Sequence, residues 1–448
     1  MRVCLVYPKF KYACGDPPLG ILYIAAYLRQ HEIPVSVIDT TFNPSIYFVR
    51  QKLFDLKPGI VGIYCDTMMY NDCLSIAALA KSVNANVIVG GPHAAVAPET
   101  LIMDRNVDSV CVGEAELTML DYVKALQKGA SLSSVDGIWH KSGKAVVKNR
   151  QRKPIQDLDS LPFPARDLID FERHISNWYH FSHVSGIRGT SILASRGCVF
   201  SCSYCQPTLD RIFGKGLRHR SPENVVQELL QLHKIYKINA FHLQDDTATV
   251  SDGWLFDFCR LMSRKNFVWS CNSRIDTLNE EKVIAMKKAG VREIYLGIES
   301  ASDRILKEIY NKTASIDPKD AIDILKRHGL RALGYFMLGA PTETYDEAES
   351  TIDFAVKSDL DMATFSISTP FPGTYMHSAF VRTGCFHDFS EYDYYRSNKH
   401  NISEIPGRDL ELLKRKAYLR FYLHPKRVGG TLSELRQLGK VLLKLKRF

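Results

Sequence analysis

Two parts of the chain alternate short apolar runs with segments of helical periodicity. In the first part, apolar runs at residues 3–7, 35–39, 60–64, 87–89 and 109–112 are each followed by an amphipathic segment. Such alternation is typical of parallel strands joined by helices. We therefore predict an α/β domain over residues 1–130, with a doubly wound, Rossmann-like sheet.

The second part repeats the alternation six times within residues 189–380. The predicted strands are residues 191–195, 240–244, 268–272, 293–297, 332–338 and 363–368, and helical patterns such as 222–236 and 280–289 separate them. Six repeats predict a partial (β/α)6 barrel of the TIM type, with its chemistry at the carboxyl ends of the strands.

The remaining residues form a connecting segment, 131–188, and a basic helical C-terminal region, 381–448. The connecting segment contains a predicted hairpin followed by Pro162 and Pro164, which keep the chain extended. We expect residues 171–188 to pack between the domains, and an approach of this stretch to the active site is the alternative.

Composition places the chain among ordinary globular proteins, with 45% hydrophobic and 24% charged residues in 448. The N-terminus lacks a signal-peptide pattern and no apolar run reaches the roughly 18 residues of a membrane span, so we expect a cytoplasmic protein. The 11 cysteines are scattered apart from one group, which does not suggest a disulfide framework. Of the net charge of +9, residues 401–448 contribute +8 through twelve Lys and Arg against four Asp and Glu.

The one cysteine group is Cys198, Cys202 and Cys205, at spacings of four and three after an apolar run. A four-iron four-sulfur cluster normally takes four thiolates, so three would leave one iron open to a substrate or cofactor. A zinc site is the alternative, with His219 as the nearest fourth ligand, but structural zinc sites usually pair two short clusters and no second cluster is present.

With Tyr204 directly before the last cysteine, this loop resembles the signature of the radical S-adenosylmethionine (SAM) enzymes. The resemblance implies that SAM chelates the open iron and is cleaved to a 5′-deoxyadenosyl radical. It also implies a SAM site at the strand ends, with Arg274 for the carboxylate, Glu299 and Ser300 near the ribose and methionine, and backbone contact from Gly339 to Pro341. Tyr204 and Asn272 complete this predicted site. Each residue could singly be a helix cap or turn, as Ser300 and Thr342 illustrate.

The strand ends of the first domain carry a second ordered set of residues, which are Thr67, Gly90, Gly91, Pro92, His93, Gly113 and Glu114. Glycines at such positions also occur in ordinary turns. As a set they resemble the cobalamin-binding domain that precedes the radical domain in cobalamin-dependent radical SAM enzymes, where these loops embrace the corrin and its nucleotide tail. The loop after the first strand lacks the Asp-x-His-x-x-Gly motif of histidine-ligated corrinoid proteins. We therefore expect cobalt without a histidine ligand.

The resemblance implies a C-methyltransferase that uses a 4Fe-4S cluster, SAM and cobalamin on a small-molecule or lipid-like substrate. A radical cyclase or oxidase without methyl transfer is the enzymatic alternative, and a non-catalytic corrinoid carrier would not need the cysteine loop. An external reductant such as flavodoxin or ferredoxin is expected, and nucleic acid is not. The basic C-terminal helices at 415–422 and 432–448 are expected to pack on the barrel, with peripheral membrane contact as the alternative.

Overall fold

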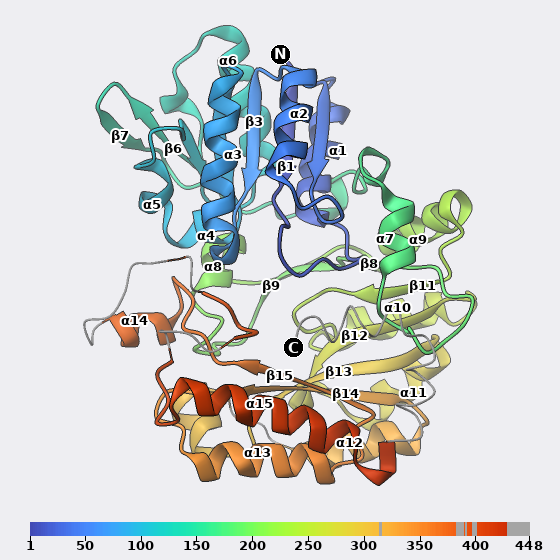
Figure 1. The fold of residues 1–448 in the computed structure, drawn as a ribbon. Coiled ribbons are helices and arrows are strands. Elements are labelled where there is room, and N and C mark those ends of the chain that lie inside the picture. The colour runs from blue at the N-terminus through green and yellow to red at the C-terminus, as the bar shows by residue number, and fades with distance from the viewer. Residues whose placement is uncertain (313–315, 382–388, 390–391, 397–400, 428–448) are drawn as a thin grey trace.

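The computed structural model describes residues 1–448 except 313–315, 382–388, 390–391, 397–400 and 428–448. Two α/β units, each with its own sheet, lie one above the other in Figure 1. The predicted fold class is confirmed. The domain boundaries at 130, 188 and 380 stay predictions.

The N-terminal sheet has seven strands in the order β2-β1-β3-β4-β5-β6-β7. They are β1 (Val3–Tyr7), β2 (Val35–Asp39), β3 (Ile60–Tyr64), β4 (Asn86–Gly90), β5 (Ser109–Cys111), β6 (Ile138–Ser142) and β7 (Ala145–Lys148). The first five are parallel, as the alternation predicts. The hairpin expected in the connecting segment forms β6 and β7 and extends this sheet, because β5 offers a free edge to which β6 pairs antiparallel.

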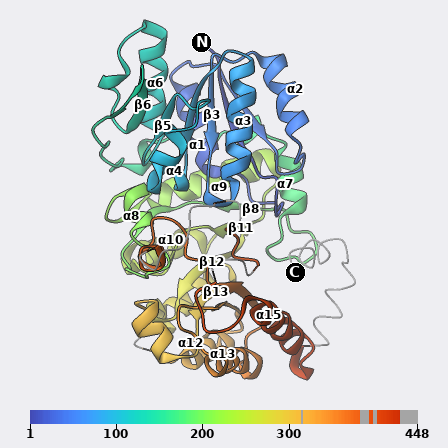
Figure 2. The same cartoon turned by 60° about the vertical axis from the view of Figure 1, so that its left-hand side comes forward.

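Helices cover both faces of this sheet (Figure 2). The long ones are α1 (Leu19–Gln30), α2 (Ile46–Leu56), α3 (Tyr70–Ser82) and α6 (Glu116–Lys128), and short ones are η1 (Thr67–Met69), α4 (Pro92–Val96), α5 (Pro98–Ile102) and η2 (Leu132–Ser134). Helices α1 and α6 bury apolar residues against one face, and α2, α3 and α5 against the other. Two buried faces explain why the strands read as continuous apolar runs.

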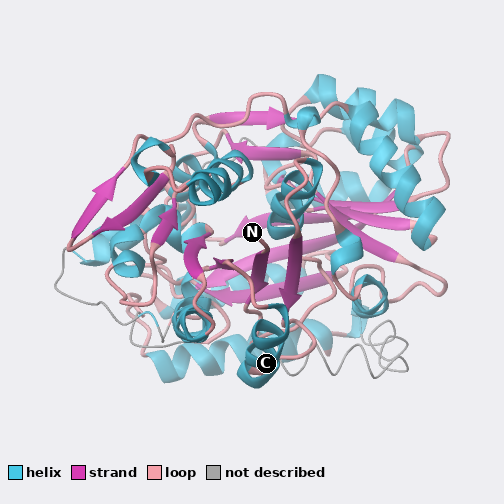
Figure 3. Ribbon diagram, turned by 90° about the horizontal axis from the view of Figure 1, so that it is seen from above, coloured by secondary structure: helices cyan, strands magenta, loops and turns pink. Residues whose placement is uncertain are grey.

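The second sheet has six parallel strands in the order β15-β14-β13-β12-β11-β8. They are β8 (Gly189–Ile192), β11 (Ala240–Leu243), β12 (Val268–Arg274), β13 (Val291–Glu299), β14 (Arg331–Leu338) and β15 (Met362–Ile367). This is the predicted half-barrel, and its helices lie outside the strands when viewed from above (Figure 3). The helices are α9 (Pro222–Tyr236), α10 (Asp252–Met262), α11 (Glu280–Lys288), α12 (Pro318–Arg327) and α13 (Tyr345–Lys357), with the shorter η5 (Ile275–Thr277), η6 (Ile305–Ile309) and α14 (Tyr375–Val381).

The first barrel strand ends earlier than predicted. After Ile192 the chain leaves the sheet and forms a hairpin, β9 (Ser195–Cys198) with β10 (Gly216–His219), which encloses α8 (Thr208–Phe213). The break is held by Asp245, whose carboxylate accepts hydrogen bonds from the Ala194 amide and the Ser195 hydroxyl. The cysteines therefore lie on a separate hairpin above the barrel.

The connecting segment contains η3 (Leu158–Ser160), η4 (Arg166–Leu168) and α7 (Phe171–Asn177), and it joins both units. The His174 ring lies 2.7 Å from the Asp39 carboxylate of the N-terminal sheet and 3.2 Å from the carbonyl of Gly15. Further along, His180 stacks on His242 of β11, with ring centroids 4.2 Å apart. Residues 171–188 thus pack between the units, as expected, and also reach into the half-barrel.

The C-terminal helix α15 (Gly407–Tyr422) lies against β15 and α13 (Figure 1). It buries Leu410, Ala417 and Phe421, and the Tyr418 hydroxyl bonds to the backbone of Phe365. The predicted helix at 415–422 is therefore the end of α15 and packs on the barrel. The predicted helix at 432–448 lies outside the described residues. Within the described part of the chain, no helix combines the length and apolarity that crossing a membrane requires.

Candidate active site

Cys198 is the last residue of β9, and Cys202 and Cys205 lie on the loop that follows it. Cys202 is buried, while Cys198 and Cys205 are partly exposed. The amides of Cys205 and Gln206 both donate to the carbonyl of Cys202, so the loop closes tightly. Burial raises the pKa of the Cys198 and Cys205 thiols, and the nearby Asp246 carboxylate raises both further. The surroundings of Cys198 and Cys205 thus disfavour free thiolates at these two residues.

Arg274, at the end of β12, lies against this loop. Its guanidinium donates a hydrogen bond to the sulfur of Cys202 at 3.4 Å and lies over the Phe200 ring at 3.9 Å. It also forms a bidentate ion pair with the Asp276 carboxylate. Burial alone would lower the pKa of Arg274, but Asp276 raises it above its ordinary value. A permanent cation therefore lies next to the thiols.

Glu299, at the end of β13, meets the loop from a second strand. Its carboxylate accepts a hydrogen bond from the Tyr204 hydroxyl at 3.3 Å and one from the Lys312 ammonium at 2.9 Å. Glu299 has a φ of +70°, in the left-handed region, and the register with β14 shifts there. This strained backbone turns the carboxylate toward the cysteine loop.

Lys312 is a site residue that the sequence analysis missed. Its ammonium is buried and also donates to the carbonyl of Gly297 at 2.8 Å. Lys312 follows η6 in a polar stretch that does not end a strand. Site residues were predicted at strand ends, so this lysine was not among them. A buried ammonium bound to Glu299 offers a second cation near the tyrosine of the cysteine loop.

Other predicted SAM residues have partners within the protein. The hydroxyl of Ser300 is fully buried and bonds to Thr351 and to the amide of Ser302, while the Asn272 amide donates to the carbonyl of Asp245. Asp246 follows Asp245 in the chain. Part of its side chain is open to solvent, and the rest is enclosed by protein. Burial and the neighbouring Asp245 raise the pKa of Asp246 to about 6.

The turn after β14 contains Gly339 and Pro341. Gly339 has a φ of +83°, and its amide donates to the Glu343 carboxylate at 2.5 Å, as the Ala340 amide does at 3.2 Å. Pro341 is partly exposed. The amides of Gly339 and Ala340 are therefore bound to Glu343. A ligand could contact the remaining surface of the turn.

We expect Glu343 to make the stability of the barrel depend on pH. Burial raises the pKa of Glu343 from 4.5 to about 7. The folded chain then binds this proton more tightly than the unfolded chain, so stability falls as pH rises from about 4.5 to about 7 and is constant above. The loss is on the order of 3 kcal/mol. Denaturant unfolding of Glu343→Gln should lack this dependence, while Glu281→Gln, an exposed control, should keep it; identical pH profiles for wild type and Glu343→Gln would contradict the assignment.

In the N-terminal unit, predicted glycines lie at the ends of neighbouring strands. A side chain at Gly90 would lie 3.5 Å from Cys111, and one at Gly91, whose φ is +110°, would collide with the carbonyl of Cys65 at 2.7 Å. Gly113 has a φ of +95°, and Pro92 begins α4. Gly90, Gly91 and Gly113 form a strip without side chains at the ends of β4 and β5, and atoms of Cys111 and Cys65 lie beside Gly90 and Gly91. Glycines at strand ends suit close approach of a large cofactor tail.

His93 is fully buried and both its ring nitrogens have partners. They lie 3.0 Å from the hydroxyls of Thr67 and Thr100. Burial lowers the pKa of His93 to about 4, so the ring is neutral. His93 thus bridges Thr67 and Thr100 and holds the loops after β3 and β4 together. Cobalt without a histidine ligand stays a prediction.

Glu114 connects the two units. Its carboxylate pairs with Arg196 of β9 at 2.9 Å and with Arg218 of β10 at 3.1 Å, and Glu116 pairs with Arg196 at 2.6 Å. All four side chains are nearly buried. Burial alone would lower the pKa of Arg196, but Glu116 and Glu114 raise it above its ordinary value. This group, the interdomain clamp, fixes the cysteine hairpin to the N-terminal unit.

The donor set fits the expected cofactors. Three thiols, a neighbouring guanidinium and the absence of a fourth cysteine on the loop suit a cluster with one open iron. Among the described residues, no three His, Cys, Asp or Glu side chains converge closely enough for a single metal ion. His219, the fourth ligand of the zinc alternative, stacks on Trp254. The side-chain-free strip beside β4 and β5 suits cobalamin.

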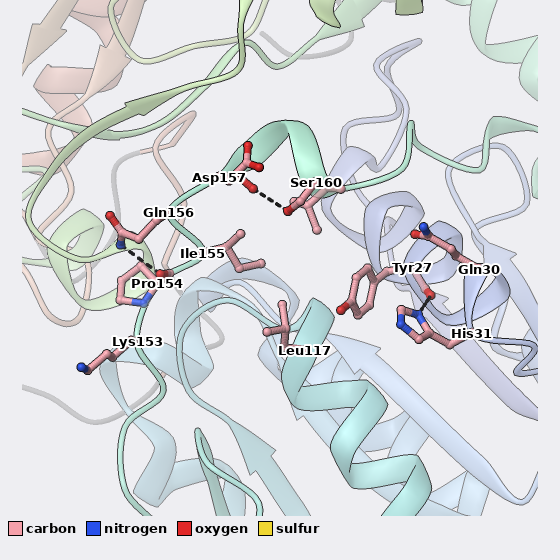
Figure 4. A pocket seen from close by; sticks show the side chains of 11 residues that line it. Tyr27, Gln30, His31, Leu117, Lys153, Pro154, Ile155, Gln156, Asp157 and Ser160 are labelled. Carbon is pink, nitrogen blue, oxygen red and sulfur yellow. Dashed lines mark hydrogen bonds between the residues drawn. The ribbon is translucent and has the colours of Figure 1, made fainter.

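A hollow of about 490 Å³ lies elsewhere, between α1, α6 and residues 153–161 (Figure 4). None of the predicted cofactor residues lines it. The site described above is therefore separate from this hollow.

Comparison with known proteins defines the class. Residues 192–355 match the model of the radical SAM superfamily, and residues 16–123 match the B12 binding domain. The fold is shared with the radical S-adenosylmethionine methyltransferase TsrM from Kitasatospora setae, solved with cobalamin and a [4Fe-4S] cluster bound. The TM-score is 0.73 at 16% identity, over 94% of this chain and 88% of that one.

The chain is 35% identical to an uncharacterized methyltransferase of Pyrococcus horikoshii, PH0819, over 95% of this chain and 93% of the relative. It is also 29% identical to the anaerobic magnesium-protoporphyrin IX monomethyl ester cyclase of Rubrivivax gelatinosus, over 88% of this chain and 72% of that protein. The chain belongs to the cobalamin-dependent radical SAM methyltransferase family, an enzyme family that uses a 4Fe-4S cluster, SAM and cobalamin.

Proposed function

We propose that this enzyme methylates an unactivated carbon of a small-molecule substrate. The observation that carries the proposal is the interdomain clamp, in which Arg196, two residues before Cys198, pairs with Glu114 and Glu116 of the B12-binding unit. The two cofactor loops therefore lie against each other. When bound, the cluster with SAM supplies a hydrogen-abstracting radical, and cobalamin supplies the methyl group.

The predicted site residues have different roles in this proposal. We infer that Cys198, Cys202 and Cys205 hold the cluster, and that Arg274, Glu299 and Tyr204 orient SAM beside it, since these groups meet at the loop. Asn272, Gly339 and Pro341 would complete the SAM site, and Thr67, Gly90, Gly91, Pro92 and Gly113 would contact cobalamin. The side chains of Ser300, His93 and Glu114 have protein partners, and we assign them to positioning these loops.

Product stoichiometry tests the reaction. With a reductant and a cell extract as the substrate source, the loaded enzyme should form S-adenosylhomocysteine and 5′-deoxyadenosine in similar amounts, because one SAM supplies the methyl group and another the radical. Labelled SAM should transfer its methyl label to one product. Chromatography with mass spectrometry measures all three.

Radical cyclisation or oxidation without methyl transfer is the second candidate. The likeness to the Rubrivivax gelatinosus cyclase over 88% of this chain favours it. A product of unchanged carbon number, together with 5′-deoxyadenosine and no S-adenosylhomocysteine, would move the assignment to this candidate.

We further propose that the basic C-terminal segment attracts the enzyme to anionic membranes and so to a lipid-like substrate. Residues 401–448 carry a net charge of +8, and each basic residue near an anionic surface contributes about 1 kcal/mol. Full-length protein should float with anionic vesicles at low salt, and protein truncated before Thr431 should float less. Equal flotation of both forms would contradict the proposal.

A further inference from the structure

We propose that a small acidic electron-carrier protein docks on one defined face of this enzyme. The face, called here the cysteine-loop face, consists of Lys153, Val199, Ser201, Arg211 and Lys215. The inference rests on the proposed function, because radical SAM chemistry needs an external reductant. In the docked complex one electron passes from the reduced carrier to the enzyme; the carrier is oxidised by one electron, and no bond forms or breaks.

The cysteine loop reaches the surface on this face. Val199, directly after Cys198, is 56% exposed, and Ser201, directly before Cys202, is also exposed. The Asn311 amide holds Ser201 through hydrogen bonds of 3.0 and 3.1 Å. Arg274 and Glu299 contact Cys202 and Tyr204 of the same loop from the barrel strands, so a docked protein would approach the cysteines at Val199 and Ser201.

The β9–β10 hairpin places a cation beside the first cysteine. Cys198 pairs with Gly216, so Lys215 lies next to this pair and across from Val199. Lys215 and Gly216 are exposed. The two strands approach each other closely, because a side chain at Gly197 would meet the carbonyl of Gly216 at 2.2 Å. The lysine position is therefore fixed relative to the cysteine loop.

Two further cations extend the same face. Arg211 of α8 and Lys153 of the connecting segment line one small hollow together with Gly214. Figure 4 shows the Lys153 side chain directed away from Tyr27 and Leu117, out of the larger hollow. Arg211 and Lys153 are both exposed. Arg211, Lys153 and Lys215 thus lie around Gly214, which directly precedes Lys215 and packs against Pro154.

No acidic side chain among the described residues neutralises these cations, although the Arg211 guanidinium donates a hydrogen bond to the carbonyl of Val96 at 3.4 Å. Within the described ranges, Lys153, Arg211 and Lys215 form no ion pair, whereas many other exposed cations do, among them Arg29, Arg150, Arg188, Lys357 and Lys416. Unpaired surface cations attract and orient an acidic partner, and this attraction weakens as salt screens it. A carrier that presents its redox group within an acidic surface matches the face in charge and in position.

The test uses the loaded enzyme and reduced flavodoxin as the acidic carrier. The triple variant Lys153→Glu, Arg211→Glu, Lys215→Glu should bind flavodoxin at least tenfold more weakly by calorimetry at low salt. Its flavodoxin-supported 5′-deoxyadenosine formation should fall similarly, while dithionite-supported formation stays unchanged. Wild-type binding should weaken with added salt.

The matched control reverses the same number of charges at the other end of the barrel strands. Arg264, Lys265 and Lys288 are exposed, form no ion pair within the described part of the chain, and precede β12 or β13. Their replacement by Glu should leave flavodoxin binding and both rates unchanged. An equal loss of binding in this control would show a general charge effect and overturn the docking face.

Several outcomes separate this inference from the proposed function. Salt-independent flavodoxin binding, or unchanged binding in the triple variant, would overturn the docking face while leaving the enzyme class intact. Binding of anionic vesicles in place of flavodoxin at these residues would assign the face to a membrane and also overturn it. Failure of the wild type to form 5′-deoxyadenosine with dithionite would instead contradict the proposed function.

Discussion

Alanine at Cys198, Cys202 or Cys205 is expected to abolish both cluster binding and reductive SAM cleavage. Three thiolates are already one fewer than a four-iron cluster normally takes, so the loss of another leaves two irons without protein ligands. Anaerobically reconstituted variants should show neither the iron content nor the visible absorption of the wild type. They should form no 5′-deoxyadenosine with dithionite.

Cys259→Ala is the matched control. Cys259 is buried in α10 and packs within the barrel core, away from the cysteine loop. The variant should lose some stability and keep its iron and its SAM cleavage. If the three loop variants retained normal iron content, the cluster would have to be placed elsewhere in the chain.

Breaking the interdomain clamp is expected to destabilise the contact between the two units strongly. Arg196→Gln leaves Glu116 buried without its ion-pair partner. Removal of one partner from a buried pair typically costs 3–5 kcal/mol, so calorimetry should show a lower unfolding temperature and separate transitions for the two units. Arg150→Gln, which breaks the exposed pair with Asp136, should leave the transition unchanged.

A second substitution distinguishes the clamp from a local packing defect. Glu116→Gln combined with Arg196→Gln removes both charges and should recover part of the lost stability, because no unpaired ion stays buried. Strictly additive losses would contradict coupling between the two residues. The Arg196 variant should also form 5′-deoxyadenosine in excess of S-adenosylhomocysteine, since its two cofactor loops are no longer held together.

Local sequence patterns predicted most elements correctly. The apolar runs that became β1, β2 and β3 were predicted to the residue, because strands buried on both faces need continuous apolar sequence. The β9–β10 hairpin was missed, since Arg196 and Arg218 give it a polar sequence and its pairing depends on the clamp. The merging of β6 and β7 with the N-terminal sheet was also not visible, because a hairpin pattern does not say which sheet edge it joins.

Some residues of the candidate site were likewise predictable from the local sequence, and others were not. Cysteine spacing marked the metal loop, and strand ends marked Arg274 and Glu299, because both signals are local in sequence. Lys312 was missed, since its role depends on the chain folding back onto Glu299, 13 residues earlier. Glu114 was predicted as a cofactor contact, and the structure shows it paired with Arg196 and Arg218.

The order of elements, the two α/β units, the cysteine loop and the family could be predicted without a structure, because periodicity and motif spacing are set by neighbours along the chain. Which charges neutralise one another depends on tertiary packing. Arg196 and Glu114 are 82 residues apart, and an ion pair over that separation exists only where packing buries both groups together. Among the described residues, the same packing left Lys153, Arg211 and Lys215 without ion-pair partners at the surface beside Gly214, which no local pattern could show.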